Sequence, residues 1–595
     1  MNVKEVAWRI QQKLLQQKEY NTLYSLHCPV TDIPLTKDLK KICADAKRIP
    51  FNAENDKFSF FESLDIFGVF DYQYYKKRWN AGFQTENVWP EDMFSSSVSI
   101  SQREDIGDIR TNWELNRHYQ FTCLAKNYYV SGEKKYFVEL AELFYDWNKH
   151  NLFLHGVEWV SAMELGIRVI SWIYTYVFIS NAIEKYNFEE REFTEKICHG
   201  ILVMTEYIIK HRARFSSANN HLIVEMFAVG MSGILFGKKE WIQLSVSILT
   251  KELPRQNYED GVNKEMSLHY QSFVMEAYGI LWLSLIHNHY VVPNSWKRYL
   301  SSMSQYMADC CGEFGEIVVF GDNDEGKLLD LQGRIEDHYR YVLQLMGMLL
   351  DKKYTSVNLI ENICWITTKN QQEIYYRKQL YIPNLVSHYK IGGYTILRSR
   401  DRKVLIGMDH AELGFGSIAA HGHADALSIQ VYYEGKPVLF DAGTYNYHVP
   451  KKIRNEIRST KAHNTVYVKN EEQAECLGPF LWGKRFLISN REMKKNETNV
   501  ELSAEIVYGN IRHKRLVEFD YDRKLSVTDI VEGAEDKCTQ VWNTDKNISV
   551  NSGKKMAGIT LKIETDAEDY EMKKSTVSLS YNNQQIANRY FFTFI

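Results

Sequence analysis

The hydrophobic periodicity of this chain changes near residues 375–385, and few folds are compatible with such a change. Before it, apolar residues recur at spacings of three and four in segments such as 161–179 and 221–236, which is typical of helices. After it, apolar and polar residues alternate in segments such as 392–410 and 426–443, with turn pairs such as Glu434-Gly435 between them. We therefore predict a helical domain over 1–375 and an all-β domain over 385–595.

Each half of the chain predicts its own architecture. Successive helices joined by short polar breaks are what an α/α toroid or solenoid needs. About 200 residues of alternating strands favour a large antiparallel β-sandwich. The predicted fold class is multidomain α and β, with an N-terminal α/α toroid followed by a C-terminal antiparallel β-sandwich, and a length of 595 residues agrees with more than one core.

Charge and hydropathy narrow the range of partners. The formal net charge is −3, so the chain has no global field that would attract nucleic acid or an anionic membrane, and we expect neither as a partner. If a partner is anionic, its electrostatic attraction must be local to a cleft. Apolar stretches such as ILWLSLI (280–286) are too short to span a bilayer, and residues 1–20 lack the apolar core of a signal peptide. We expect a cytoplasmic protein, or a periplasmic one if a signal segment has been removed.

The segment FSSANNHLIVEMF (215–227) places two asparagines and a histidine at the start of a predicted helix. One asparagine serves as a helix cap, which is the ordinary reading. Asn220 and His221 then exceed what one cap requires. Amide and imidazole donors at a helix N-terminus make a good seat for a carboxylate.

A second predicted helix start, GVNKEMSLHYQSFVMEAYG (261–279), carries His269 and Tyr270 close to Glu265. A tyrosine there is commonly a packed ring with a bonded hydroxyl. If the helices alternate in direction, however, Tyr270 and Asn220 meet at one rim of a toroid.

Other polar groups of the helical half have both structural and functional interpretations. Glu164 and Arg168 have the i, i+4 spacing of a helix-stabilising ion pair. Arg117 and His118 fit either an acidic ligand or the protein surface. Residues 321–330 (GDNDEGKLLD) resemble part of a calcium loop but lack the glutamate at its twelfth position, so we expect a capped helix start there.

The β half contains AAHGHADALSIQVYYEGKPVLFDAG (419–443), which alternates like a strand. In a strand, His421 and His423 point to the same face. His423, Asp441 and His463 together fit a zinc site with one open position, and they fit a hydrogen-bond network equally well. His421 is then left as a proton carrier near neutral pH.

Four of these segments resemble the heparinase II/III family of polysaccharide lyases: NNHLIVE, EMSLHY, HGHADALSIQVYYEGKPVLFDAGTYNY and RNEIRSTKAHNTV. The resemblance implies an α/α toroid followed by an antiparallel β-sandwich. It implies that Asn220 engages the substrate carboxyl group and that Tyr270 and His421 are catalytic. It also implies zinc ligands at His423, Asp441 and His463, places His221 after the asparagine as in several members, and implies a tyrosine of the β half at Tyr445 or Tyr447. The candidate substrate contacts are His221 and Tyr445, together with Arg117, His118 and His269, which we take from the residues themselves.

The activity implied by the resemblance is β-elimination on a glycan that contains uronic acid, such as a heparin- or heparan-sulfate-like chain, leaving a 4,5-unsaturated uronate. The expected partner is an acidic polysaccharide or oligosaccharide, and no organic cofactor is expected. The residues leave three rivals open. These are a glycoside hydrolase using carboxylates such as Glu225, Glu265 or Asp322, a non-catalytic glycan-binding relative, and a metal-dependent enzyme working at His421 and His423.

Overall fold

A computed structural model describes residues 3–101, 103–334, 337–522, 524–534, 538–544, 549–550, 554–556, 559–563 and 569–594. The chain forms two compact units. Unit 1 comprises Met1–Arg255, Ser272–Ser301 and Gly326–Tyr381, and unit 2 comprises Gln256–Gln271, Ser302–Glu325 and Ile382–Ile595. Two segments from the predicted helical domain therefore pack with the β half. The domain boundaries 1–375 and 385–595 stay a prediction.

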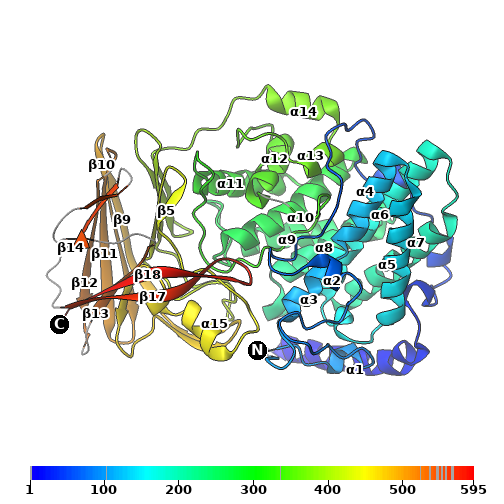
Figure 1. Cartoon of the computed structure of the whole chain (residues 1–595), viewed down its shortest axis with the longest axis horizontal. Helices are drawn as coiled ribbons and strands as arrows, with labels where there is room; N and C mark the ends of the chain where they lie inside the picture. Colours follow the sequence, from blue (N-terminus) through cyan, green and yellow to red (C-terminus); the bar gives the residue numbers. More distant parts are fainter. Residues whose placement is uncertain are drawn as a thin grey trace. The chain divides into compact units, whose positions relative to one another are not determined.

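The N-terminal part of the chain is helical, as the periodicity predicts, and forms the α/α toroid (Figure 1). Within unit 1, α6 packs against α4, α7 and α8. The helices are α1 (Val3–Thr22), α2 (Tyr72–Tyr75), α3 (Ile109–Asn116), α4 (Tyr119–Ser131), α5 (Lys134–His150), α6 (Ala162–Tyr186), α7 (Arg191–His211), α8 (Asn220–Leu235), α9 (Lys239–Gln256), α10 (Leu268–His287), α11 (Asn294–Cys310), α12 (His338–Leu350), α13 (Glu361–Ile366) and α14 (Lys369–Tyr376).

The starts of α6 and α8 follow from their capping residues. The Ser161 hydroxyl accepts a hydrogen bond from the Glu164 backbone N–H at 3.4 Å, and the Asn219 side chain accepts one from the His221 N–H at 3.2 Å. Each cap satisfies a donor that the helix itself cannot pair. The predicted asparagine cap of α8 is thereby confirmed.

Helix α6 corrects the expectation that every apolar stretch is too short for a membrane. By length and composition Ala162–Tyr186 could span one, but 89% of its apolar window is buried inside the protein. A helix that is apolar on all sides and enclosed by other helices is a core helix of a folded domain.

The strands of the C-terminal part form mainly antiparallel sheets. A five-stranded sheet has the order β1-β2-β3-β4-β5, and a four-stranded sheet has the order β12-β11-β10-β9. The first contains β1 (Val386–Tyr389), β2 (Tyr394–Arg398), β3 (Val404–Asp409), β4 (Ile429–Tyr433) and β5 (Lys436–Leu439), and the second contains β9 (Leu487–Lys495), β10 (Asn499–Tyr508), β11 (Ile511–Asp520) and β12 (Lys524–Glu532).

One apolar core joins these two sheets face to face, which makes the β half a sandwich. The core takes Ile406 and Ile429 from the first sheet and Leu502 and Val517 from the second. The predicted turn Glu434-Gly435 connects β4 to β5. Both residues have positive φ, at 46° and 78°, as a two-residue hairpin turn requires.

The remaining strands complete unit 2. A second four-stranded sheet has the order β17-β18-β13-β6, a three-stranded one the order β14-β16-β15, and β7 pairs with β8. The bounds are β6 (Val466–Val468), β7 (Ala474–Gly478), β8 (Leu481–Arg485), β13 (Cys538–Thr544), β14 (Ser549–Val550), β15 (Lys554–Met556), β16 (Ile559–Ile563), β17 (Asp569–Ser580) and β18 (Asn583–Phe594), and the short helix α15 spans Lys451–Ile457.

Candidate functional site

The segment that carries His421 and His423 is a loop that leads into β4 and not the predicted strand. Ala419 and Leu427, on either side, have φ values of 52° and 67°, which a strand does not allow. The two imidazoles nevertheless converge on one partner, because both contact the buried carboxylate of Asp322.

Asp322 is the hub of the site. Its Oδ2 lies 2.7 Å from the Arg454 guanidinium and 3.3 Å from His421 Nδ1, and its Oδ1 lies 3.0 Å from His423 Nε2. Burial alone would raise the pKa of Asp322, but Arg454 and the hydrogen bonds from His421 and His423 hold it well below its usual value. A carboxylate only accepts hydrogen bonds, so each of these imidazole nitrogens is a donor. In neutral His421 this leaves Nε2 as the acceptor.

Local backbone contacts bring Asp322 to this position. Its N–H donates to the His421 carbonyl at 2.8 Å, and its own carbonyl accepts from the Ser267 hydroxyl at 2.6 Å. Gly321 has φ +70°, and a Cβ there would lie 2.3 Å from the Met266 carbonyl oxygen. Only glycine fits between these segments. Residues 321–330 are therefore an irregular loop, and the predicted capped helix start is wrong.

Tyr270 lies against His421 in the first turn of α10. The two rings are stacked with centroids 3.7 Å apart, and the Tyr270 hydroxyl lies 2.9 Å from that of Tyr447. The Ser267 hydroxyl accepts from the Tyr270 N–H at 3.1 Å and so caps the helix. On the other side of the imidazole, Glu265 Oε2 lies 3.6 Å from His421 Nε2.

Both phenols of this cluster are neutral acids at ordinary pH. Burial raises the pKa of Tyr270 well above its usual value, and the negative charges of Asp324 and Asp322 raise it further. The pKa of Tyr447 is raised well above its usual value by burial and then by Asp322. The residue before Tyr270, His269, contacts Asp324 through Nε2 at 2.9 Å and so lies in the same network.

The structure favours Tyr447 over Tyr445 as the tyrosine of the β half in this cluster. Tyr447 contacts the Tyr270 hydroxyl, and its N–H donates to the Tyr581 hydroxyl at 3.2 Å. Tyr445 is half-buried and has φ 61°. No hydrogen bond within the described residues joins the side chain of Tyr445 to the cluster.

His423, Asp441 and His463 form a candidate metal centre. One ligand atom from each lies within 4.8 Å of the others. In the described part of the chain, His423 Nδ1 and His463 Nε2 are buried without a hydrogen-bond partner. Asp322 orients His423, and Asp441 Oδ2 lies 2.7 Å from His463 Nδ1, as carboxylates orient metal-binding imidazoles. Two unpaired imidazole nitrogens beside a carboxylate fit a borderline-soft divalent cation such as Zn²⁺.

The residues of the helical half belong to unit 1. Asn220 is buried at the first position of α8, and His221 follows it half-buried. Tyr270 and His421 belong to unit 2. The meeting of Asn220 with these two side chains stays a prediction.

Arg117 and His118 are held inside the core of unit 1. Arg117 is 1% exposed and makes a two-pronged ion pair with Glu164 at 2.8 Å. His118 is fully buried, and its Nδ1 accepts from Trp172 Nε1 at 2.8 Å. Neither side chain is presented to a ligand, so we do not carry them into the proposal below.

The expected ion pair between Glu164 and Arg168 is replaced by longer-range pairs. Glu164 binds Arg117, and Arg168 binds the Glu158 carboxylate at 2.8 Å. A buried guanidinium needs a close, well-oriented acid, and these partners come from outside the helix that carries the pair.

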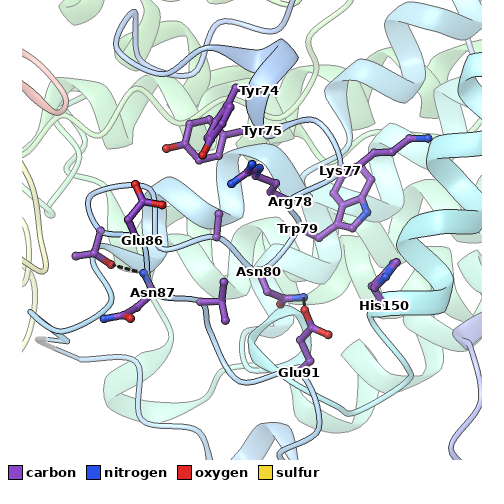
Figure 2. A pocket seen from close by; sticks show the side chains of 13 residues that line it. Tyr74, Tyr75, Lys77, Arg78, Trp79, Asn80, Glu86, Asn87, Glu91 and His150 are labelled. Carbon is purple, nitrogen blue, oxygen red and sulfur yellow. Dashed lines mark hydrogen bonds between the residues drawn. The ribbon is translucent and has the colours of Figure 1, made fainter.

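Two cavities formed by described residues lie in unit 1. One, of about 270 Å³, is shown in Figure 2, where Tyr74, Tyr75 and Arg78 lie across from Asn80 and Glu91. The Arg78 guanidinium stacks on the Tyr74 ring at 3.8 Å. Lys77 and Arg78 are balanced there by Glu86 and Glu91, so the lining carries no excess of charge. The other, of about 370 Å³, lies beside the start of α8.

Comparison with protein-family models identifies the family of this chain. Residues 66–315 match the model described as heparinase II/III N-terminus, and residues 383–590 match the model described as heparinase II/III-like, C-terminal. The chain belongs to the heparinase II/III family. The N-terminal match contains Asn220 and Tyr270, and the C-terminal match contains His421 and Tyr447.

Curated relatives and solved structures agree with the heparinase II/III assignment. The chain is 23% identical to a heparin-sulfate lyase of Bacteroides stercoris over 72% of this chain and 63% of that protein. It is 21% identical to one of Pedobacter heparinus over 71% and 60%. These matches span less than two thirds of either relative. Heparinase III superposes with a TM-score of 0.63 at 16% identity, covering 97% of this chain and 88% of that one. A heparan sulfate lyase of Pedobacter heparinus (a mutant) gives 0.59 at 17%, covering 94% and 84%. At such identities the structures show a shared fold.

Site residues that the sequence did not single out come mainly from distant segments. Asp322 was considered only as a hydrolase carboxylate, and Arg454, within the quoted RNEIR stretch, was given no role. Only their proximity in three dimensions reveals their roles, because Asp322 and His421 are 99 residues apart in the chain.

Proposed function

We propose that this protein is a polysaccharide lyase that cleaves a uronic-acid-containing glycan of the heparin or heparan-sulfate type by β-elimination. The observation that carries the proposal is the cluster of Tyr270, His421 and Tyr447. It joins two neutral phenols to an imidazole whose acceptor nitrogen is set by Asp322. The names of the relatives support the same class of substrate.

Elimination from a uronate needs three catalytic functions from the protein. The proton at C5 must be taken by a base, the charge that spreads onto the carboxylate must be stabilised, and the oxygen that leaves from C4 must be protonated. We assign the second function to Asn220, with His221 beside it at the N-terminus of α8, where backbone N–H groups and the helix dipole also favour an anion.

The acid and the base come from the Tyr270 cluster. Because burial and two carboxylates keep Tyr270 protonated, its phenol can deliver a proton to the leaving oxygen. His421 Nε2 is the candidate base when the C5 proton lies on the opposite face of the ring. If the proton lies on the same face as the leaving group, Tyr270 performs both transfers, with Tyr447 as its hydrogen-bond partner.

A glycoside hydrolase is less consistent with the carboxylates. It requires two carboxyl groups flanking the bond. Asp322 is occupied by Arg454 and two histidines, and Glu225, in unit 1, accepts the Ala213 N–H at 2.6 Å. A binding protein without turnover would have no need for a phenol pair next to an oriented imidazole.

We also propose that His423, Asp441 and His463 bind Zn²⁺. Such an ion would tie together the segments that carry these ligands and act as a Lewis acid toward any oxygen that reaches its open position. Elemental analysis of the purified protein, with His463→Ala as the comparison, tests this. About one zinc per chain, lost in the variant, is expected. Equal metal content in both would contradict the assignment.

The activity is tested on a panel of heparosan, heparan sulfate, hyaluronan and alginate. Appearance of an ultraviolet-absorbing unsaturated product from the heparosan or heparan sulfate chains is expected. Reducing ends that form without this absorbance would indicate hydrolysis. Absence of product from the whole panel, with a correctly folded protein, would contradict the proposal.

A further inference from the structure

The cavity beside the start of α8 lies entirely in unit 1 and has a volume of about 370 Å³. This is within the range of small-molecule sites. Two stretches supply its walls: the connection from α7 to α8 together with the first turn of α8, and the C-terminal half of α9. The lining residues are Arg212, Ala213, Arg214, Phe215, Ala218, Leu222, Ile248, Lys251, Glu252 and Arg255.

The lining carries an excess of positive charge. Four cationic side chains face a single acid, Glu252, and that acid is already bound by Arg255 at 2.7 Å. Within the described residues, neither Arg212, Arg214 nor Lys251 forms an ion pair. The pKa of Arg212 is lowered by burial and then by the neighbouring charge of Arg214, and the nearby Glu225 carboxylate opposes this only in part. Neighbouring like charges that no ion pair neutralises are stabilised when an anion binds.

The rest of the lining is apolar. Phe215, Ala218, Leu222 and Ile248 lie among the cations. Phe215 is held with φ 56°, a left-handed conformation that is strained for a non-glycine residue. Strain of this kind is typical of ligand-binding segments. An apolar wall with cations at its edge matches a sugar ring that carries sulfate or carboxylate groups, because such a ring has an apolar face and an anionic edge.

The position of the cavity links it to the proposed reaction. Ala218 and Leu222 line it, and between them in the chain lie Asn219, Asn220 and His221. The charge-balanced cavity of Figure 2 has no such excess of cations and no such connection.

We propose that this cavity is a subsite for a second acidic sugar unit, one next to the uronate whose carboxylate Asn220 engages. This inference rests on the proposed function for the identity of the chain that occupies it. The ligand is a saccharide unit bearing sulfate or carboxylate, bound by Arg212, Arg214 and Lys251. The cavity would therefore determine which substrate charge is preferred, and it would not determine which bond is cleaved.

The test uses the full chain in a Tyr270→Phe background, so that the probe stays intact. The probes are tetrasaccharides of unsulfated heparosan and of N-sulfated heparosan, and binding is measured by calorimetry at two salt concentrations. The test variant is Arg214→Gln with Lys251→Gln. The control is Lys239→Gln, which removes an exposed charge from the first turn of the same helix as Lys251 and does not line the cavity.

We expect the double variant to raise Kd at least about tenfold and to weaken the salt dependence of binding, because two charge contacts are lost. A larger loss for the N-sulfated probe identifies sulfate as the bound group, and an equal loss for both probes identifies the carboxylate. Kd within about twofold of the Lys239→Gln control for both probes would overturn the inference. Arg214 and Lys251 are exposed, so melting temperatures equal to the parent are expected.

The outcome is separable from that of the proposed function. If the wild-type chain forms no unsaturated product while the double variant loses binding, the reaction is wrong and the subsite stands. If product forms while the double variant binds as the control does, the subsite is wrong and the reaction stands.

Discussion

Replacing Tyr270 by phenylalanine removes one hydroxyl and leaves the ring that stacks on His421 at 3.7 Å. The hydroxyl makes a hydrogen bond of 2.9 Å with Tyr447, and loss of such a bond costs about 1 kcal/mol of folding free energy. The melting temperature should then fall by roughly 1–2 °C. Loss of a positioned general acid lowers turnover by about 10²–10⁴-fold, or about 2.7–5.5 kcal/mol of transition-state stabilisation. The catalytic effect should therefore far exceed the structural one.

The assay is the initial rate of unsaturated product on the best chain of the panel, with melting followed by circular dichroism. Tyr278→Phe is the matched control. Tyr278 lies on the same helix, is buried, and donates its hydroxyl to the Leu249 carbonyl at 2.9 Å. It should lose similar stability and keep kcat within about twofold. Turnover of Tyr270→Phe at the level of this control would refute the role of the phenol.

Three further predictions concern folding energetics. Asp322→Asn leaves the buried guanidinium that it neutralises without a counter-ion and should cost about 3–5 kcal/mol, so a melting temperature equal to wild type would contradict its place as hub. Gly321→Ala puts a Cβ 2.3 Å from a carbonyl oxygen, whereas Gly416→Ala at a similar φ of 64° meets nothing within 4 Å. Thermal melting should show a much larger loss for the first. Burial opposes ionisation of Glu114, but Lys327 and two arginines lower its pKa to about 2 from 4.5. Its contribution, about 3 kcal/mol, is present above pH 4.5 and is lost as pH falls toward 2. Glu114→Gln should flatten that part of the profile of melting temperature against pH, and an unchanged profile would contradict it.

Periodicity was sufficient to predict the elements that pack by local rules. Helix α8 begins after a capping asparagine, and the hairpin at Glu434-Gly435 turns with two positive φ values. Both features depend on residues within a few positions of one another, so the sequence states them directly.

The site itself depends on contacts between distant segments. The alternation around His421 is typical of a strand, but the segment is a loop, and its His421 is held by a backbone hydrogen bond and a side-chain contact with Asp322, which lies 99 residues earlier. For the same reason Glu164 pairs with Arg117 and not with its helical neighbour. Local spacing cannot predict which distant acid or base will satisfy a buried charge.

The choice between Tyr445 and Tyr447 shows a finer limit. The two tyrosines lie two positions apart in the chain, so either of them fits the family pattern equally well. The structure separates them because Tyr445 occupies a left-handed turn, while Tyr447 is anchored through the Tyr581 hydroxyl.

Products formed in water enriched in heavy oxygen distinguish elimination from hydrolysis at the level of single atoms. A uronate chain cleaved by the wild-type protein should give two fragments that contain no oxygen from the solvent, one of them bearing a double bond between C4 and C5. Fragments that each lack the double bond, with one solvent oxygen gained per cleavage, would contradict the account.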